Sequence, residues 1–247
     1  MIYCIDIGHN LQGIDTGAVK GATKEDTLNY EIGVRVISRL LKYNNSVINS
    51  LTRARKAKTY AEALELRCDA SNEGSADLFV SIHHNIDDGK GHGTEVWYMS
   101  ENGRQVAEKI CREMEKLGFK NRGAKKAGVD GKNLFVLRNT KAVAVLIEVA
   151  FIDNDGDMKR WSVERIASAI TTALTGKTDI FTYIDPQRAE RMTQIRLTQI
   201  FCNSMNIKDA EGKPLLIDGI LGAKTRYCLQ KLLIYLDKMQ NTEYTRG

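Results

Sequence analysis

The sequence predicts an α/β fold, in which helices flank a mostly parallel sheet and a small all-α domain follows it. Three apolar runs are typical of buried strands in a parallel sheet, and they cover residues 1–7, 77–85 and 142–147. Four segments have helical periodicity, and they cover residues 25–43, 59–73, 101–117 and 157–174. Strands and helices therefore alternate along the chain, which is typical of parallel strands joined by helices.

Three weaker strand patterns complete the expected sheet, and they cover residues 46–52, 94–99 and 133–138. Residues 121–132 have neither helical nor strand periodicity. We expect a long surface loop there, of the kind that can line a substrate site.

The chain divides into two expected domains. Its 247 residues suffice for one large α/β domain with a substantial core, and residues 1–176 form this predicted catalytic domain. Residues 177–187 have little periodicity and include one of only two prolines, which predicts a linker. Residues 188–247 are expected to form two or three short helices, and a unit of this size favours a binding module over an enzyme with a pocket.

The composition argues against membrane insertion and against nucleic-acid binding. Hydrophobic residues make up 43% of the chain and charged residues 27%, and no apolar run is long enough to cross a bilayer. The net charge of +5 favours anionic polymers, but the basic residues are too dispersed to indicate nucleic acid. An anionic cell wall fits the same charge. The composition does not specify an oligomeric state.

The five cysteines are scattered and form no CxxC pair. This pattern predicts reduced, mostly buried thiols and argues against a disulfide framework or a zinc knuckle. The chain starts directly with a strand pattern, without the basic region, apolar region and cleavage site of a secretory signal. We therefore expect synthesis in the cytoplasm without a signal peptide.

Three of the predicted strands end in side chains that can bind metal or transfer protons. The first strand ends near His9, the second at His83 and His84, and the third at Glu148. Ligands of open α/β sheets gather at the carboxyl ends of the strands. A single histidine at such a position is more often a hydrogen-bonded structural residue. The convergence of three strand ends favours a chemical site instead.

Two further residues near these strand ends have both structural and functional interpretations. Glu25 begins a helix, where a lone carboxylate usually stabilises the helix dipole. Arg67 could hold a carboxylate near the site, although a solvated or structural arginine is the more frequent case. His83 and His84 point to opposite faces of their strand, so only one of them is expected to bind a given ion.

Hydrolytic zinc sites use three ligands from histidine and acidic residues and keep a fourth position for water. His9, Glu25 and His83 supply such a set, and Glu148 is then the expected general base. Two imidazoles favour Zn²⁺ over Mg²⁺, while cobalt or iron could occupy the same ligands. The chain has no GxSxG motif, no phosphate-binding loop and no GxGxxG motif at a strand-to-helix turn.

The residues at these positions resemble the zinc-dependent N-acetylmuramoyl-L-alanine amidases of bacterial autolysins and phage endolysins. Beside Glu25, the matching segments are Ile5–His9, Leu51–Arg53, Ala76–Asn85, Leu134–Arg138 and Val145–Asn154. They occur in order over residues 1–176. Asn10 and Ala150 depart from the family, which often has glycine at both positions.

The resemblance implies a twisted, mostly parallel sheet flanked by helices, with one Zn²⁺ bound by His9, Glu25 and His83. It also implies that Glu148 is the catalytic carboxylate. The implied reaction cleaves the amide between the lactyl group of N-acetylmuramic acid and the L-alanine of the peptidoglycan stem peptide. Asn85 is a further predicted substrate-binding residue. Bacterial peptidoglycan is thus the expected partner.

The C-terminal part resembles short helical peptidoglycan-binding modules through residues 217–225, with residues 195–203 as the preceding helix. A wall hydrolase that is made in the cytoplasm acts on the wall only after its release. Phage endolysins and mother-cell autolysins both work in this way, and we favour the endolysin.

Two alternative functions stay open at this point. A zinc carboxypeptidase, or a peptidase that cuts within the stem peptide, would use the same metal and the same base. A non-catalytic wall-binding protein is disfavoured because all four chemical positions are occupied.

Overall fold

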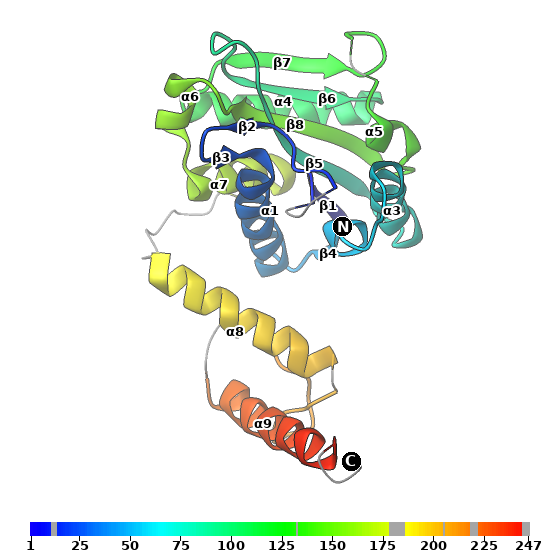
Figure 1. The fold of residues 1–247 in the computed structure, drawn as a ribbon, viewed down its shortest axis with the longest axis vertical. Helices are drawn as coiled ribbons and strands as arrows, with labels where there is room; N and C mark the ends of the chain where they lie inside the picture. The colour runs from blue at the N-terminus through cyan, green and yellow to red at the C-terminus, as the bar shows by residue number, and fades with distance from the viewer. Residues whose placement is uncertain (11–13, 132, 178–185, 205, 218–221, 244–247) are drawn as a thin grey trace. The chain divides into compact units, whose positions relative to one another are not determined.

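The chain forms two compact units, Met1–Phe181 and Thr182–Gly247, in the computed structural model shown in Figure 1. The structure describes residues 1–10, 14–131, 133–177, 186–204, 206–217 and 222–243. Most of the predicted linker, residues 178–185, lies outside these ranges.

The first unit is built on a six-stranded sheet with the strand order β4-β1-β5-β8-β6-β7. Its strands are β1 (Ile2–Ile7), β4 (Ser46–Asn49), β5 (Leu78–Asn85), β6 (Thr94–Tyr98), β7 (Asn121–Lys126) and β8 (Val143–Phe151). Paired strands are parallel, except that β6 and β8 are antiparallel. The predicted mostly parallel sheet is therefore confirmed. A short antiparallel ribbon, β2 (Val19–Lys20) and β3 (Thr23–Lys24), leads into the first helix.

Helices cover both faces of this sheet (Figure 1). They are α1 (Glu25–Lys42), α2 (Leu51–Ala54), α3 (Tyr60–Glu73), α4 (Glu101–Lys116), α5 (Phe135–Asn139), α6 (Asp155–Arg160) and α7 (Val163–Thr175). Helices α1, α4 and α7 share one buried apolar cluster with the sheet. Helices α3 and α5 contribute to a second cluster on the opposite face.

The two clusters explain why the strand runs are apolar without alternation. Ile147 of β8 belongs to the first cluster, whereas its neighbour Leu146 belongs to the second. Successive side chains of a strand point to opposite faces, and here both faces are covered by helices. A central strand such as β8 is therefore buried almost throughout its length.

The structure contradicts the strand predicted at residues 133–138. Residues 135–138 belong to α5, a helix of five residues that ends at Asn139 and buries Val136 and Leu137. A run this short does not reveal its period, because one helical turn buries the same apolar residues as a short strand. The strand predicted at residues 46–52 is also too long, since β4 ends at Asn49 and α2 begins at Leu51.

The prediction of a long loop at residues 121–132 is wrong for the first half of this segment. Residues Asn121–Lys126 form β7, which pairs with β6 at the edge of the sheet. Edge strands often carry charged side chains, which protect them from pairing with other chains. The sequence NRGAKK has this composition, and its polarity concealed the strand.

The second unit is helical, with α8 (Pro186–Ser204) and α9 (Ala223–Glu243). Its described core consists of Cys202, Leu215, Cys228 and Leu232, with Ile207 packed against them. The predicted wall-binding motif covers residues 217–225, of which residues 218–221 lie outside the described residues.

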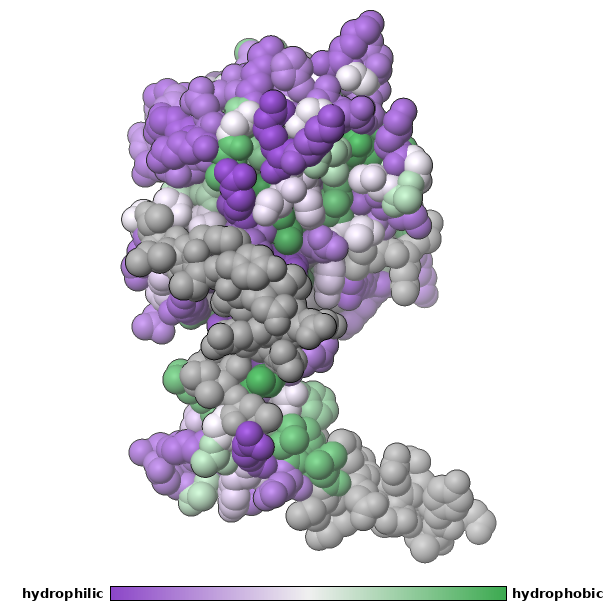
Figure 2. All heavy atoms as spheres, turned by 90° about the vertical axis from the view of Figure 1, so that its left-hand side faces the viewer, coloured by the Kyte–Doolittle hydropathy of each residue, from purple (hydrophilic) through white to green (hydrophobic). Residues whose placement is uncertain are grey.

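All five cysteines are free and buried, as the sequence predicted. The side of the first unit shown in Figure 2 is covered mainly by hydrophilic residues, with smaller hydrophobic areas between them. Among the described residues, no helix is both long and apolar enough to span a bilayer.

Candidate metal centre

The turn after β1 places His9 at the carboxyl end of the sheet. The Gly8 N–H donates to the Ile82 carbonyl at 3.0 Å, which continues the pairing of β1 with β5. His9 then has a φ of +64°, a left-handed conformation that is uncommon for a residue with a side chain. The Asn10 N–H donates to the Asp15 carbonyl at 2.8 Å.

Arg67 of α3 holds this turn from behind. Its side chain is only 3% exposed, and it donates to the Ile7 carbonyl at 2.6 Å and the His9 carbonyl at 2.7 Å. It also donates to Asp6 Oδ1 at 2.5 Å and to Asn10 Oδ1 at 2.7 Å. Arg67 is therefore a buried structural residue that fixes the main chain on both sides of His9.

Asp6 is the buried counter-ion of Arg67. Its carboxylate also accepts hydrogen bonds from Ser50 Oγ at 2.5 Å and Ser81 Oγ at 2.7 Å. Burial raises the pKa of Asp6. The charge of Arg67 and these hydrogen bonds outweigh burial, so the pKa lies below its usual value. Asp6 remains ionised and anchors the end of β1.

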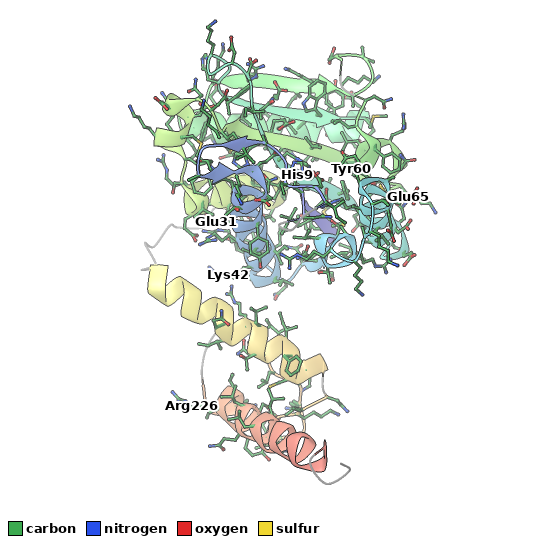
Figure 3. The ribbon with its side chains drawn as sticks, viewed as in Figure 1. His9, Glu31, Lys42, Tyr60, Glu65 and Arg226 are labelled. Atoms are coloured by element: carbon green, nitrogen blue, oxygen red, sulfur yellow. The ribbon has the colours of Figure 1, made fainter. Side chains whose placement is uncertain are left out.

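The structure brings His9, Glu25 and His83 together. One potential ligand atom from each residue lies within 4.8 Å of the other two. The carboxylate of Glu25 lies between the rings, with Oε2 3.1 Å from His9 Nε2 and Oε1 3.1 Å from His83 Nδ1. Figure 3 shows His9 close to the beginning of α1, where Glu25 is the first residue. Three residues distant in sequence thus meet at one point.

Glu25 is fixed by the main chain and not only by the two histidines. Oε1 accepts the His84 N–H at 3.0 Å, and Oε2 accepts the Ala18 N–H at 2.8 Å. Burial raises the pKa of Glu25, but the hydrogen bonds and charges of His83 and His9 hold the pKa far below its usual value. Glu25 is thus an ionised, nearly buried carboxylate. Its contacts differ from those of an acidic residue that only stabilises the start of a helix.

Asp15 orients the ring of His9. His9 Nδ1 lies 2.5 Å from Asp15 Oδ1, so Nε2 is left to face Glu25. Burial lowers the pKa of His9, but Asp15 and Glu25 outweigh it and raise the pKa to about 9. A carboxylate on the outer nitrogen is the usual support of a metal-binding histidine.

Two glycines leave room for the imidazole rings. A Cβ atom at Gly17 would lie 2.4 Å from the His9 ring and 2.7 Å from Glu25 Oε2, and Gly17 also has a φ of +68°. A Cβ atom at Gly8 would lie 2.4 Å from the His83 ring. The donor set of two imidazoles and one ionised carboxylate, packed closely against glycine, fits a zinc ion.

His84 lies on the opposite face and has a structural environment. Its Nδ1 is 2.7 Å from Asn29 Oδ1, and its Nε2 accepts the Trp161 Nε1–H at 3.0 Å. Burial lowers the pKa of His84 to about 3, so the ring is neutral. These contacts agree with the expectation that only one of the two adjacent histidines faces the site. His92, in the loop after β5, is exposed.

Glu148 lies beside this cluster on the neighbouring strand. In the register of β5 and β8, His83 pairs directly with Glu148. Directly paired residues of adjacent strands point to the same face of a sheet. The side chain of Glu148 is mostly buried, since the residue is 6% exposed. All four residues of the predicted chemical set therefore lie in one region of the fold.

Asn85 lies two residues beyond His83, at the end of β5. Its Oδ1 accepts the N–H of the next residue, Ile86, at 3.1 Å. The backbone of Asn85 pairs with Phe151 across a register shift in β5 and β8. Its substrate-binding role stays a prediction.

Comparison with known proteins assigns the first unit to a family of amidases. The chain matches the N-acetylmuramoyl-L-alanine amidase family Amidase_3 over residues 4–176, which is more than half of its length. The chain belongs to this family. The match ends where the predicted catalytic domain ends.

The Amidase_3 chain is similar in sequence to an endolysin and to a further N-acetylmuramoyl-L-alanine amidase. It is 36% identical over 159 residues to an endolysin of Bacillus phage SPP1. The aligned residues make up 61% of this chain and 54% of the relative. It is 30% identical over 162 residues to the N-acetylmuramoyl-L-alanine amidase LytC of Bacillus subtilis (strain 168), which covers 63% of this chain and 30% of the relative. The chain thus spans only part of the length of these relatives.

The fold of the Amidase_3 chain also has solved counterparts. The structure aligns with the catalytic domain of the CD27L endolysin, which targets Clostridia Difficile, with a TM-score of 0.64 and 31% sequence identity. The alignment covers 72% of this chain and 99% of that domain. The catalytic domain of CwlV, an N-acetylmuramoyl-L-alanine amidase from Bacillus (Paenibacillus) polymyxa, has a TM-score of 0.60 and 27% identity over 71% of this chain and 96% of that one.

Two residues of this region were not singled out from the sequence of the Amidase_3 chain. Asp15 reaches His9 only through the left-handed turn, which a sequence pattern does not reveal. Glu95 pairs with Glu148 across the antiparallel strands β6 and β8. The position of Glu95 in an apolar strand, TEVWY, was the available signal, because a buried carboxylate needs a charged partner.

Proposed function

We propose that this chain is a zinc-dependent peptidoglycan amidase, which hydrolyses the amide between the lactyl group of N-acetylmuramic acid and the L-alanine of the stem peptide. The observation that carries the proposal is the meeting of His9, Glu25 and His83 within 4.8 Å, beside Glu148 on the adjacent strand. Membership of the Amidase_3 family supports the same substrate.

His9, Glu25 and His83 would hold the zinc ion. Bound zinc supplies a Lewis acid that polarises the amide carbonyl and makes water more acidic. Asp15 keeps His9 Nε2 directed at the centre, and the main chain around His84 and Ala18 keeps both oxygens of Glu25 in place. These contacts orient His9 and Glu25 without the help of an ion.

Glu148 would act as the general base and then as the general acid. It would accept a proton from the attacking water and return it to the nitrogen of L-alanine as that amine leaves. Its pairing with His83 supports this role, because a carboxylate there would lie near a carbonyl that the metal polarises. A base and an electrophile on neighbouring strands are sufficient for amide hydrolysis.

The test uses purified protein and insoluble peptidoglycan. Cleavage should release stem peptides with new L-alanine amino termini, and a chelator should abolish this release. Glu148→Gln should bind zinc with unchanged stoichiometry but lose turnover. Full activity of the metal-free protein would contradict the proposal.

We also propose that the second unit binds the cell wall. It has its own core of Cys202, Leu215, Cys228 and Leu232, and residues 195–203 fall within α8, where the resemblance to wall-binding modules expected a helix. The Glu148→Gln chain should sediment with peptidoglycan, whereas the same variant ending at residue 177 should sediment less. Equal sedimentation of both chains would contradict the role of this unit.

A further inference from the structure

Three acidic and basic side chains form a row across the sheet, beginning at the candidate metal centre. Glu148 of β8 pairs with His83 of β5 on one side and with Glu95 of β6 on the other. Directly paired residues point to the same face. Adjacent strands are about 4.8 Å apart, so Glu95 lies about 10 Å across the sheet from His83.

Two cations from β7 hold Glu95 at the end of this row. Arg122 Nε lies 2.7 Å and Lys125 Nζ 2.5 Å from the same oxygen, Glu95 Oε2. The other oxygen accepts the Trp97 Nε1–H at 3.2 Å. Burial raises the pKa of Glu95, but the hydrogen bonds from Lys125 and Arg122 bring the pKa below its usual value. Glu95, which is only 3% exposed at its side chain, stays ionised.

The two cations remain accessible although their common partner is buried. The side chain of Arg122 is 29% exposed and that of Lys125 is 28% exposed. The guanidinium of Arg122 lies 4.9 Å from the centre of the Phe151 ring, and the ammonium of Lys125 lies 5.3 Å from the centre of the Trp97 ring. Aromatic faces attract cations and keep them in place.

Arg122 and Lys125 bring more positive charge than Glu95 alone requires. Glu95 supplies one negative charge, which a single cation would neutralise. The carboxylate of Glu148 lies next to Glu95 on the same face of the sheet. Both cations are partly exposed, so they reach solvent at the end of the row.

We propose that Arg122 and Lys125 form a subsite for a carboxylate of the peptidoglycan stem peptide, with Glu95 as their positioning residue. This proposal rests on the proposed amidase function. An extended peptide spans about 3.3–3.6 Å per residue, so 10 Å corresponds to about three residues. A carboxylate on the second or third residue beyond the cleaved bond reaches the cations, and arginine and lysine bind carboxylates through charge-assisted hydrogen bonds.

A purely electrostatic role makes a different prediction. If Arg122 and Lys125 serve only to shield Glu148 from the negative charge of Glu95, their loss raises the pKa of the general base. The pH profile of kcat would then shift, and the shift would be the same for every substrate. A binding role instead changes KM, and only for substrates that carry the carboxylate.

The experiment uses the full zinc-loaded chain and two soluble muramoyl peptides. One carries free carboxylates on the second and third stem residues, and the other carries carboxamides at both positions. The unaltered chain should have a lower KM for the carboxylate form. Lys125→Met and Arg122→Gln should each raise this KM about tenfold, the usual effect of losing one charged hydrogen bond, and should leave the KM for the carboxamide form unchanged within about twofold.

Lys126→Met is the matched control. It removes the same charge from the next position of β7, where successive side chains point to opposite faces, and Lys126 is exposed. It should leave both KM values unchanged. Lys125→Arg keeps the charge and should retain most of the preference for the carboxylate form, which separates lost binding from a disturbed strand.

Two results would overturn the subsite. One is an equal KM of the unaltered chain for the two substrates, and the other is an equal loss for both substrates in Lys125→Met and Arg122→Gln. These results differ from failure of the proposed function, in which the unaltered chain cleaves neither substrate at the bond to L-alanine.

Discussion

At the scale of single residues, the centre depends on groups that would not touch a metal ion. Arg67 donates to the carbonyls of Ile7 and His9 and is balanced by Asp6. His9 is held in a left-handed conformation that it would rarely adopt alone. The position of the first ligand is therefore set by an arginine on α3, far from it in sequence.

Arg67→Met should reduce both stability and zinc affinity. Removing one partner of a buried ion pair leaves the charge of Asp6 uncompensated, which typically costs about 3–5 kcal/mol. Urea unfolding of the zinc-free protein measures the stability, and a competitive chelator titration measures zinc affinity. Arg53→Met is the control, because it removes an exposed pair with Glu73 and should cost less than about 1 kcal/mol. Equal effects of the two substitutions would show that Arg67 has no special role.

Gly17→Ala should weaken zinc binding by about tenfold or more, in the range found when groups supporting metal ligands are changed. The added Cβ would lie 2.4 Å from the His9 ring. Gly21→Ala is a close control, because Gly21 also has a positive φ of +57° but nothing lies within 4 Å of its added Cβ. Both substitutions should lower the free energy of unfolding by about 1 kcal/mol, because alanine is unfavourable in a left-handed backbone conformation. Zinc titration should separate them, and unchanged affinity in Gly17→Ala would refute the close fit.

Asp6 should make the stability of the fold depend on acidic pH. Its pKa in the folded chain lies below the usual value, because Arg67, Ser50 and Ser81 outweigh burial. The ionised carboxylate therefore stabilises the fold above about pH 4, and this contribution is lost as the pH falls through the folded pKa. The free energy of unfolding should be measured between pH 3 and pH 7. Asp6→Asn should be much less stable than the unaltered chain at pH 7, and the difference should shrink below pH 4.

At the scale of elements, the buried strands were predictable and the short surface elements were not. β1, β5 and β8 have continuous apolar runs because helices cover both faces, and such runs are recognisable in the sequence. α5 and β7 are set by tertiary contacts, namely the second apolar cluster and the pairing with β6. A five-residue helix and a charged edge strand have no reliable period of their own.

The approach of His9, His83 and Glu148 to one another was predictable for a related reason, whereas Glu25 begins a helix. The carboxyl ends of parallel strands meet at one edge of a sheet, so residues at those ends approach one another. Glu95 escaped prediction because β6 runs antiparallel to β8, which brings the beginning of β6 to the end of β8. Asp15 depends on the backbone conformation of one turn.

The interface between α1 and α7 offers a test at this scale. Glu164 of α7 accepts hydrogen bonds from Arg35 Nε at 2.6 Å and Arg39 Nη2 at 2.8 Å on α1. Glu164→Gln should lower the free energy of unfolding by about 1 kcal/mol, because the partners are partly exposed and solvent screens the charges. Glu101→Gln, which removes an exposed pair within α4, should change the free energy of unfolding much less than Glu164→Gln does. Equal effects would show that the pairs between helices add nothing.

At the scale of the whole molecule, the topology separates the scaffold from the chemistry. The helices α1, α4 and α7 share the larger apolar cluster with one face of the sheet. The opposite face carries the row of His83, Glu148 and Glu95 beyond the smaller cluster. The sheet thus joins the metal centre, the base and the proposed carboxylate subsite through adjacent strands, so their spacing is fixed by the distance between strands.

The buried thiols give each unit its own built-in reporter of opening. Cys4, Cys68 and Cys111 lie in the first unit, whereas Cys202 and Cys228 lie in the second. Burial raises the pKa of Cys4 to about 12 and that of Cys68 to about 11, so these sulfurs react with an alkylating reagent only after local unfolding. Mass spectrometry of the labelled peptides should therefore time the unfolding of the two units separately, in one unaltered chain and without an added probe.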